Sequence, residues 1–304
     1  MHGYNLANNP DTSLANRGMQ QMTTFADLPA GRSFVKMHGL LNHFVIVDAR
    51  TDPFTPDDAE IVRICDSRTG VGGDQLVIVQ PPSAAGRKGG ASAFMRILNV
   101  DAREVEACGN ATRCVAWLLL EEEQSDEVVL ETLAGLIACK RTGAKEVSCS
   151  MGHVSMKWQD VPLAEECDTH HLDLQFGPLT DAIALSIGNP HVVFFVDDLD
   201  AVDIEGLAPD IQKLPLFPNE VNVGVAQMLS ADRMRLTVYE RGAGLTTACG
   251  SGACVAVYAA RMRGLTDKRI MTVQMPAGPV GIEITADDTA IMTGPVEFCF
   301  SGYL

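Results

Sequence analysis

Hydrophobic residues along the chain occur in short runs separated by turn-forming residues. Five of these runs have the length and composition of strands: 44–48, 76–80, 94–98, 127–133 and 136–141. Segments 57–65 and 111–124 predict helices, and 81–92, which is rich in glycine and alanine, predicts an exposed loop. Because helices alternate with short strands bounded by turns, the pattern predicts a mixed α/β fold and disfavours a long parallel sheet.

A segment of the first half of the chain recurs in the second half. Residues 95–114 and 234–254 share one order of residues. Each segment begins with Met-Arg and apolar residues, continues with Ala-Cys-Gly and ends with a second cysteine. The two copies lie about 140 residues apart, which is too far for a solenoid repeat. Two pseudo-symmetric halves are therefore expected, with a polar linker near 158–169.

Each copy of Ala-Cys-Gly places a cysteine where a loop enters a predicted helix. Asn110 and Ser251 are residue types that cap helices, and glycine lets backbone N–H groups approach a ligand closely. The positive end of a helix favours a bound anion and lowers the pKa of a nearby thiol. If the halves face each other, Cys108 and Cys249 are opposed across a cleft. Two opposed acid–base groups suit inversion at a carbon that carries a proton, because one removes the proton and the other returns one to the opposite face.

The composition and net charge of the chain exclude some classes of binding partner. With 23 Lys and Arg against 39 Asp and Glu, the net charge is −16, and no basic cluster of the kind that binds phosphates is present. No apolar run approaches the roughly 20 residues that span a bilayer. We therefore expect neither nucleic acid nor membrane as a partner. The nine cysteines are odd in number and contain no C-x-x-C pair, which argues against a disulfide framework and a structural zinc site.

The first 32 residues are polar and rich in asparagine. They contain no basic segment followed by an apolar one, as a secretory signal would. Residues 1–32 are therefore predicted to be a disordered N-terminal extension. The cytoplasm is the expected compartment, and its reducing environment suits unpaired thiols.

Seven short motifs then stand in one order along the chain. They are Lys36-Met-His-Gly with Asn42, Gly70-Val-Gly-Gly-Asp-Gln75, Asn99, Ala107-Cys-Gly-Asn110, Gly188-Asn-Pro-His191, Val221-Asn-Val223, and Glu240-Arg-Gly-Ala-Gly244 with Ala248-Cys-Gly-Ser251. On these motifs the chain resembles the diaminopimelate epimerase family, from about Ser33 to its C-terminus. The resemblance implies an isomerase that interconverts LL- and meso-2,6-diaminopimelate for lysine and peptidoglycan precursor synthesis. It also implies that the enzyme uses no cofactor, neither PLP nor a metal.

The resemblance assigns roles to individual residues. Cys108 and Cys249 take the two catalytic positions, with Cys108 as donor and Cys249 as acceptor by family convention. The positions expected to contact substrate are Asn42, Gln75, Asn99, Gly109, Asn110, Asn189, Asn222, Glu240, Arg241, Gly250 and Ser251. Arg241 suits the distal carboxylate of the substrate, and Glu240 suits an ammonium group. His191 and Glu240 are expected to tune the thiols.

The resemblance also implies an architecture. Each half is expected to wrap its strands around a central helix, with the active site in the cleft between the halves. The first domain is expected to comprise 33–155 together with a returning strand at 295–304, and the second domain 156–294. A homodimer is the expected assembly.

The chain departs from the family pattern beside two of the motifs. Leu41 and His43 flank Asn42 where the family usually has glycine and an acidic residue, and Leu245 replaces a common glutamate. None of these changes touches the thiols, so they bear on the substrate and leave the reaction type as it is. The alternative function is therefore a same-fold racemase acting on another amino acid.

Other interpretations of the same residues are weaker. A non-catalytic amino-acid-binding protein of this fold is disfavoured because both thiols are present. Gly70-x-Gly72-Gly73 precedes a predicted strand, whereas a dinucleotide-binding fingerprint follows one. Two site positions keep a structural alternative: Asn189 belongs to a Gly-Asn-Pro turn, and His191 adjoins an apolar strand.

Overall fold

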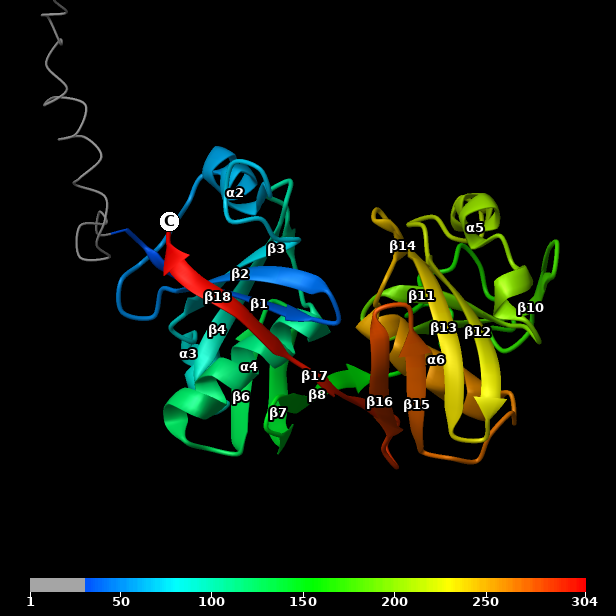
Figure 1. The fold of residues 1–304 in the computed structure, drawn as a ribbon. Helices are drawn as coiled ribbons and strands as arrows, with labels where there is room; N and C mark the ends of the chain where they lie inside the picture. The colour runs from blue at the N-terminus through cyan, green and yellow to red at the C-terminus, as the bar shows by residue number, and fades with distance from the viewer. Residues whose placement is uncertain (1–30) are drawn as a thin grey trace, which may run out of the picture.

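The computed structural model describes residues 31–304 of the chain. The predicted extension, 1–32, lies almost wholly outside the described residues. Regular structure begins at Ser33, as the sequence predicts. Figure 1 shows two lobes side by side, each with one long helix enclosed by strands. This arrangement confirms the predicted mixed α/β fold with two pseudo-symmetric halves.

The first lobe contains the N-terminal strands and the last strand of the chain. Its elements are β1 (Ser33–Gly39), β2 (Asn42–Asp48), α2 (Asp58–Cys65), β3 (Gln75–Gln80), α3 (Ala84–Lys88), β4 (Ala93–Asn99), β5 (Glu104–Val105), α4 (Gly109–Glu123), β6 (Glu127–Thr132), β7 (Gly135–Gly143), β8 (Glu146–His153) and β18 (Glu297–Tyr303). Strand β18 returns from the second lobe and pairs antiparallel with β1, as Figure 1 shows.

The second lobe contains the elements between β8 and β18. These are β9 (Leu172–Phe176), β10 (Leu179–Ser186), β11 (Pro190–Phe195), the short helix η3 (Leu199–Ala201), α5 (Ile204–Gln212), β12 (Asn222–Ser230), β13 (Arg233–Glu240), β14 (Gly244–Thr246), α6 (Gly250–Met262), β15 (Ile270–Met275), β16 (Gly278–Ile284) and β17 (Thr289–Pro295). Strand β17 pairs antiparallel with β8, and this ladder joins the two lobes.

The two lobes share one topology. Strands β4 and β6 are parallel neighbours connected through α4, and β13 and β15 are parallel neighbours connected through α6. A second parallel pair precedes each of these units: β2 with β3 in the first lobe and β11 with β12 in the second. The later strand of this pair is antiparallel to the first strand of the unit, β3 to β4 and β12 to β13. The repeated sequence motif therefore corresponds to a repeated strand–helix–strand unit, with its cysteines at equivalent places.

The predicted elements are largely present. The five predicted strands correspond to β2, β3, β4, β6 and β7, and the two predicted helices to α2 and α4. The prediction of a loop over 81–92 is wrong in part, because this segment contains the short helix α3. Ser83 Oγ accepts a hydrogen bond from Gly86 N–H and so begins the helix. Glu131 of β6 holds this cap in place by accepting from both the backbone N–H and the hydroxyl of Ser83.

Each long helix lies at the centre of a hydrophobic core. Cys114, Val115 and Leu119 of α4 pack among the strands of the first lobe, and α6 is buried from Gly252 to Ala260 in the second lobe. Helices enclosed in this way have no broad solvent face, so they are apolar on most sides. Helices α4 and α6 have 15 and 13 residues. Within residues 31–304, no helix is long and apolar enough to cross a membrane.

The hairpin between β1 and β2 carries a contact from one lobe to the other. Leu40 and Leu41 form its two-residue turn with φ of 54° and 60°, the left-handed region that such hairpin turns require at both positions. Leu40 is buried in the core of the second lobe, whereas Leu41 is exposed. The burial of Leu40 offsets the strain of left-handed backbone at a bulky residue. The turn places Asn42 at the start of β2, despite the departure from the family pattern at Leu41.

Replacing Gly70 with alanine is expected to lower the free energy of unfolding by about 3 kcal/mol. A Cβ there would lie 1.9 Å from the carbonyl oxygen of Arg63 and 2.8 Å from that of Ile64, so the loop between α2 and β3 would have to move. Urea unfolding measures the change. Gly281→Ala is the control, because a Cβ at Gly281 would meet its nearest neighbour at 3.7 Å. An equal loss in both variants would contradict the steric argument.

Candidate active site

Both cysteines of the repeat occupy the N-cap of a long helix. Cys108 precedes α4 and Cys249 precedes α6, each with extended backbone and without a side-chain capping bond. The expectation that Asn110 and Ser251 cap these helices is wrong, because the helical bonding already begins at the carbonyl of each cysteine. Asn110 and Ser251 are instead the second residues of their helices. The N–H groups of both first turns have no helical acceptor and can donate to a bound anion.

The two helix N-termini converge on Met151 and Met292, here called the methionine pair. A Cβ on Gly109, the first residue of α4, would lie 2.6 Å from Met292 Cε and 2.8 Å from Met151 Cε. A Cβ on Gly250, the first residue of α6, would lie 3.0 Å from Met292 Sδ. The methionines belong to β8 and β17, the ladder that joins the lobes. The absence of side chains at both glycines therefore lets the two cysteine-led helices meet from opposite lobes.

Cys108 lies partly buried beside the start of β2. Its thiol donates to Asn42 Oδ1, with 3.7 Å between sulfur and oxygen, and the same oxygen accepts from Asn110 Nδ2 at 3.3 Å. Asn42 Nδ2 donates in turn to Asp74 Oδ2 at 3.1 Å. The structure thus brings Asn42 and Asn110, both predicted from the sequence, to the Cys108 thiol.

Gln75 and Asn99 lie at the same edge of the sheet as Asn42. They are register partners in the β3–β4 ladder, and Gln75 Nε2 donates to Asn99 Oδ1 at 2.9 Å. Strand β3 is the parallel neighbour of β2, which begins at Asn42. Gln75 Oε1 is buried and has no hydrogen-bond partner among the described residues. This oxygen can therefore accept a hydrogen bond from a ligand.

Cys249 is buried beside a group of polar side chains from the second lobe. Its Sγ lies 3.5 Å from Ser251 Oγ, and that hydroxyl lies 3.1 Å from His191 Nε2. Asn189 Nδ2 donates to the same hydroxyl at 3.3 Å. Ser251, His191 and Asn189, which the sequence predicts from three separate motifs, therefore form one connected group around the thiol.

Asn222 and Arg241 are tied to each other. The buried amide of Asn222 accepts from Arg241 N–H at 2.8 Å and donates to Pro190 O at 3.0 Å. The exposed Arg241 guanidinium donates to Asn219 O at 2.9 Å. The side-chain amide of Asn222 is thus fully engaged with the backbone of Arg241 and of Pro190. Asn222 therefore positions the loop that carries Arg241.

The Glu240 carboxylate acts on both thiols from the end of β13. It accepts from Thr246 Oγ1 at 2.6 Å. Burial raises the pKa of Cys249 well above its usual value, and the Glu240 carboxylate raises it further. Burial also raises the pKa of Cys108; backbone N–H groups of α4 and the Arg113 guanidinium lower it, whereas Glu240 raises it. Both thiols therefore hold their protons at neutral pH in the protein without substrate.

His191 is expected to stay neutral down to acid pH. Burial lowers the pKa of His191 to about 3, and the Arg241 cation adds to this lowering. In the unfolded chain the imidazole titrates near pH 6.5, so between pH 7 and 5 the unfolded state takes up a proton that the folded state does not. The free energy of unfolding is therefore expected to fall by about 2 kcal/mol over this interval through His191 alone.

Urea unfolding of the wild-type chain and of His191→Gln at both pH values tests this prediction. The stability of the wild type relative to the variant should fall by about 2 kcal/mol from pH 7 to pH 5, because glutamine takes up no proton. A difference between the two chains that does not change with pH would contradict a neutral His191.

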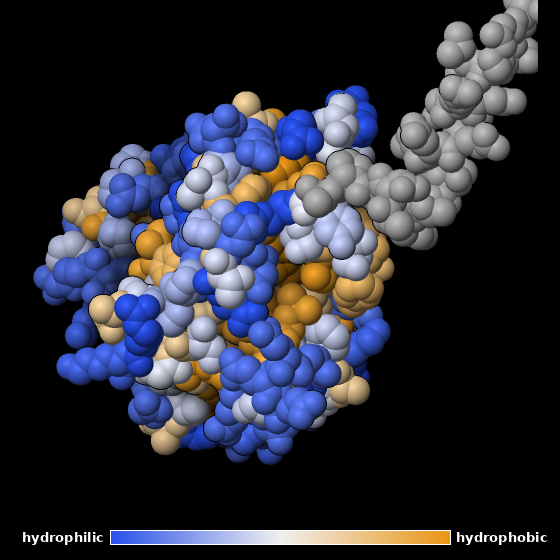
Figure 2. Space-filling view, turned by 90° about the vertical axis from the view of Figure 1, so that its left-hand side faces the viewer, coloured by the Kyte–Doolittle hydropathy of each residue, from blue (hydrophilic) through white to orange (hydrophobic). Residues whose placement is uncertain are grey.

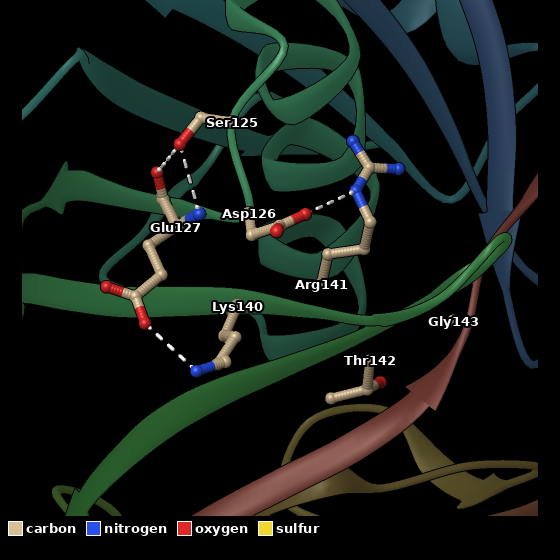
Figure 3. A pocket seen from close by; sticks show the side chains of 7 residues that line it. All are labelled: Ser125, Asp126, Glu127, Lys140, Arg141, Thr142 and Gly143. Atoms are coloured by element: carbon tan, nitrogen blue, oxygen red, sulfur yellow. Dashed lines mark hydrogen bonds and ion pairs between the residues drawn. The ribbon is translucent and has the colours of Figure 1, made fainter.

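The polar hollow in Figure 3 lies at the end of α4 opposite to Cys108. It is lined by Ser125, Asp126, Glu127, Lys140, Arg141, Thr142 and Gly143. Its charged groups pair with one another, Glu127 with Lys140 and Asp126 with Arg141. Because these charges are satisfied and no thiol lines the hollow, we do not place the reaction there. In the described part of the chain, no group of three or more His, Cys, Asp or Glu is arranged to hold a metal ion.

Comparison with known proteins identifies the family. The family model described as diaminopimelate epimerase matches residues 34–157 and 183–299. The chain belongs to the diaminopimelate epimerase family. A diaminopimelate epimerase from Rhodospirillum centenum is 46% identical over 273 residues, which cover 90% of this chain and 92% of that protein. One from Phenylobacterium zucineum is 46% identical over 278 residues, which cover 90% and 98% of the two chains.

Solved structures share the fold of this diaminopimelate epimerase family member at low sequence identity. A PhzF-family phenazine biosynthesis protein from Bacillus anthracis aligns with a TM-score of 0.63 at 15% identity, covering 90% of this chain and 98% of that one. A probable proline racemase from Agrobacterium radiobacter aligns with a TM-score of 0.62 at 16% identity, covering 90% and 92%. These likenesses concern the fold alone.

Four residues near the thiols of this family member carry little or no signal in the sequence. Met151 and Met292 lie in strand patterns and look like any other core residue. Asp74 lies inside the motif Gly70–Gln75 and Arg113 inside the repeated segment 95–114, and a charge among small or apolar residues is the one available signal. Only the folded chain shows that Met151, Met292 and Arg113 lie at the helix N-termini and that Asp74 accepts a hydrogen bond from Asn42.

Proposed function

We propose that this chain interconverts LL- and meso-2,6-diaminopimelate by proton transfer through Cys108 and Cys249, without PLP or another cofactor. Membership of the family and 43–46% identity to diaminopimelate epimerases support the reaction. The observation that carries the two-thiol mechanism is the convergence of Gly109 and Gly250 on the methionine pair. It brings together two helix N-termini, each led by a cysteine.

The carboxylate at the reacting carbon is proposed to bind between the two helix N-termini. The N–H groups of Gly109 and Asn110 on one side, and of Gly250 and Ser251 on the other, are the proposed donors. The α-proton of an amino acid is weakly acidic, so negative charge that develops on the carbon and its carboxylate must be stabilised. Fixed N–H groups and helix dipoles supply this stabilisation without reorganising during the reaction.

In the proposed step, one cysteine acts as a thiolate and the other as a thiol. The thiolate takes the α-proton, the electron pair of the C–H bond stays on the carbon and its carboxylate, and the thiol gives its proton to the opposite face. The carbon is inverted and the cysteines exchange protonation states. Cys108 is the proposed donor and Cys249 the proposed acceptor, and the reverse reaction exchanges these roles.

Glu240 is proposed to couple substrate binding to thiol ionisation. Its carboxylate raises the pKa of Cys249 in the protein without substrate. A substrate ammonium bound at Glu240 neutralises this effect and so favours the thiolate once the substrate is present. His191, which stays neutral, is proposed to hold the Ser251 hydroxyl beside the Cys249 thiol.

The remaining contacts are proposed to recognise the rest of the substrate. Arg241 suits the distal carboxylate, because its guanidinium is exposed and only Nη1 is used by the protein among the described residues. The other proposed contacts are Asn42, Gln75, Asn99, Asn189 and Asn222. Asn222 acts in this proposal through the Arg241 loop.

The domain boundaries, the assembly and the compartment are proposals as well. We propose a first domain of 33–155 with 295–304 and a second of 156–294, in line with the return of β18 to β1. A homodimer is proposed, and β18 carries three exposed aromatic residues, Phe298, Phe300 and Tyr303, on which it could be built. Figure 2, which looks onto the first lobe, shows hydrophobic surface between hydrophilic side chains. The proposed compartment is the cytoplasm, whose reducing conditions suit nine free cysteines.

Chiral chromatography of LL-diaminopimelate incubated with the purified chain tests the proposed reaction. The assay contains a reductant and EDTA and no PLP. The meso isomer is expected to accumulate until the two isomers reach equilibrium, and the same mixture is expected from the meso side. Proline and histidine serve as competing substrates. Inversion of either one, with diaminopimelate unchanged, would overturn the proposed substrate.

A further inference from the structure

Arg113 is a fully buried cation one helical turn beyond Cys108. Its hydrogen-bond partners in the described part of the chain are neutral: Asn110 Oδ1 at 2.7 Å, Met292 Sδ at 3.4 Å and Gly109 O at 3.5 Å. Its Nε is buried and has no partner among the described residues. A buried charge without a counter-ion is costly, and an apolar residue of similar size would pack there at lower cost. The presence of the charge therefore points to a role other than packing.

Backbone close to the guanidinium keeps it in place. A Cβ on Gly39, at the end of β1, would lie 3.2 Å from Arg113 Nη2, and one on Gly294 of β17 would lie 3.1 Å from Arg113 Nε. Small residues on two strands thus make room for this side chain beneath the start of α4. A side chain at either glycine would press on the guanidinium, so the Arg113 side chain is closely packed on these two sides.

A directed chain of hydrogen bonds leads from Arg113 to a carboxylate. Arg113 is only a donor, so Asn110 turns its Oδ1 toward Arg113 and donates from Nδ2 to Asn42 Oδ1. Asp74 as a carboxylate only accepts, so Asn42 donates to it from Nδ2. Arg113 at one end of this hydrogen-bond series and Asp74 at the other therefore fix the side-chain amides of Asn110 and Asn42 in one orientation. The oxygen that Asn42 presents is then the one that accepts from the Cys108 thiol.

The second lobe contains no counterpart of this arrangement. Arg113 lies five residues beyond Cys108 on α4, and the residue five beyond Cys249 on α6 is the thiol Cys254. The charged group with the largest effect on the pKa of Cys249 is the carboxylate of Glu240, which raises it. The duplicated motif is therefore electrostatically asymmetric, with a cation behind Cys108.

The charged and titratable groups around Cys108 and Arg113 come from several elements. Arg113 of α4 lowers the pKa of Cys108, and Glu240 of β13 raises it. Three further buried thiols face the guanidinium: Cys114, Cys149 and Cys254. Of these, burial raises the pKa of Cys114 and of Cys254, so these two are neutral neighbours. Arg113 is therefore a buried positive charge that a Cys108 thiolate meets.

We propose that Arg113 is a positioning residue for proton transfer at Cys108: it orients Asn110 and Asn42 toward the thiol and supplies the positive charge that stabilises the thiolate. The inference rests on the proposed two-thiol function and deepens it. Removing the charge should disfavour ionisation of Cys108 and leave Cys249 nearly unchanged. Cys249 is thus a control within the same molecule.

Alkylation of the substrate-free protein by iodoacetamide, followed across pH by mass spectrometry of the two cysteine peptides, tests the proposal. In Arg113→Met the alkylation rate of Cys108 at pH 8 is expected to fall about tenfold, the change produced by one pKa unit, and that of Cys249 by less than about twofold. Arg113→Lys, which keeps the charge without the planar fork, should restore part of the rate. In the epimerisation assay, kcat of Arg113→Met is expected to fall about 30-fold with KM within about threefold.

Equal changes at both thiols, or no change at Cys108, in a variant with a cooperative unfolding transition would overturn the proposal. If Arg113→Met does not fold, Asn110→Asp provides the second test. It keeps the size of the side chain and gives Arg113 a counter-ion, so alkylation of Cys108 should again slow selectively, and an unchanged rate would overturn the proposal. Alkylation needs no substrate, so absence of epimerisation in the wild type would overturn the proposed function without deciding the role of Arg113.

Discussion

Replacing either Cys108 or Cys249 with alanine is expected to lower the rate of diaminopimelate epimerisation by at least about a thousandfold. Each thiol serves one face of the reacting carbon, and no described neighbour of comparable acidity stands at the helix N-termini to replace it. Asn42 and Ser251, which contact the two sulfurs, are neutral groups that do not exchange protons with carbon acids. The rate is measured by chiral chromatography with saturating LL-diaminopimelate.

Cys114→Ala and Cys254→Ala are matched controls for the loss of a buried thiol. These cysteines lie farther along the same two helices and have no exposed surface. Activity of the folded controls is expected to stay within about threefold of the wild type. Substantial epimerisation by Cys108→Ala or Cys249→Ala would remove the corresponding thiol from the mechanism.

Replacing Glu240 with glutamine is expected to change activity and thiol reactivity in opposite directions. Loss of the carboxylate removes the proposed ammonium contact, so kcat/KM should fall about a hundredfold. The carboxylate raises the pKa of Cys249, so its removal lowers that pKa and exposes more thiolate at a given pH. Alkylation of Cys249 by iodoacetamide at pH 8 should therefore become at least about threefold faster.

Thr246→Val is the matched control for Glu240→Gln. It removes the hydroxyl that donates to the Glu240 carboxylate at 2.6 Å but keeps the charge. Its effect on kcat/KM is expected to be about tenfold or less. Slower alkylation of Cys249 in Glu240→Gln would show that the carboxylate does not oppose ionisation of the thiol, and that part of the account would fail.

Much of the fold could be predicted from local patterns. The runs that became β2, β3 and β4 are short, apolar and bounded by turn residues, so periodicity and composition were sufficient. The helix α3 could not be predicted in this way, because its cap depends on Glu131, a residue of a distant strand. The pairing of β8 with β17 is also a long-range event that local composition does not encode.

In the candidate site, too, the features that depend on local sequence could be predicted and those that depend on long-range packing could not. The duplicated Ala-Cys-Gly places a cysteine at each helix start, and the structure has Cys108 and Cys249 there. That Asn110 lies inside the helix could not be predicted, because asparagine is a preferred capping residue whereas Cys108, which occupies the cap position, makes no side-chain capping bond. The buried position of Arg113 was not predictable either, since a charged side chain in a helix is exposed far more often than enclosed.

The measurement that tests the two-thiol account most directly is the fate of the α-proton in D₂O. LL-Diaminopimelate is incubated in D₂O with the purified protein and a reductant to low conversion. The isomers are then separated, and the deuterium content of each is measured by mass spectrometry. The account predicts one deuterium at the inverted carbon of the meso product and none in the remaining substrate, because one thiol removes the proton and the other delivers a deuteron from solvent. A meso product that retains the original proton would indicate a single base and contradict the account.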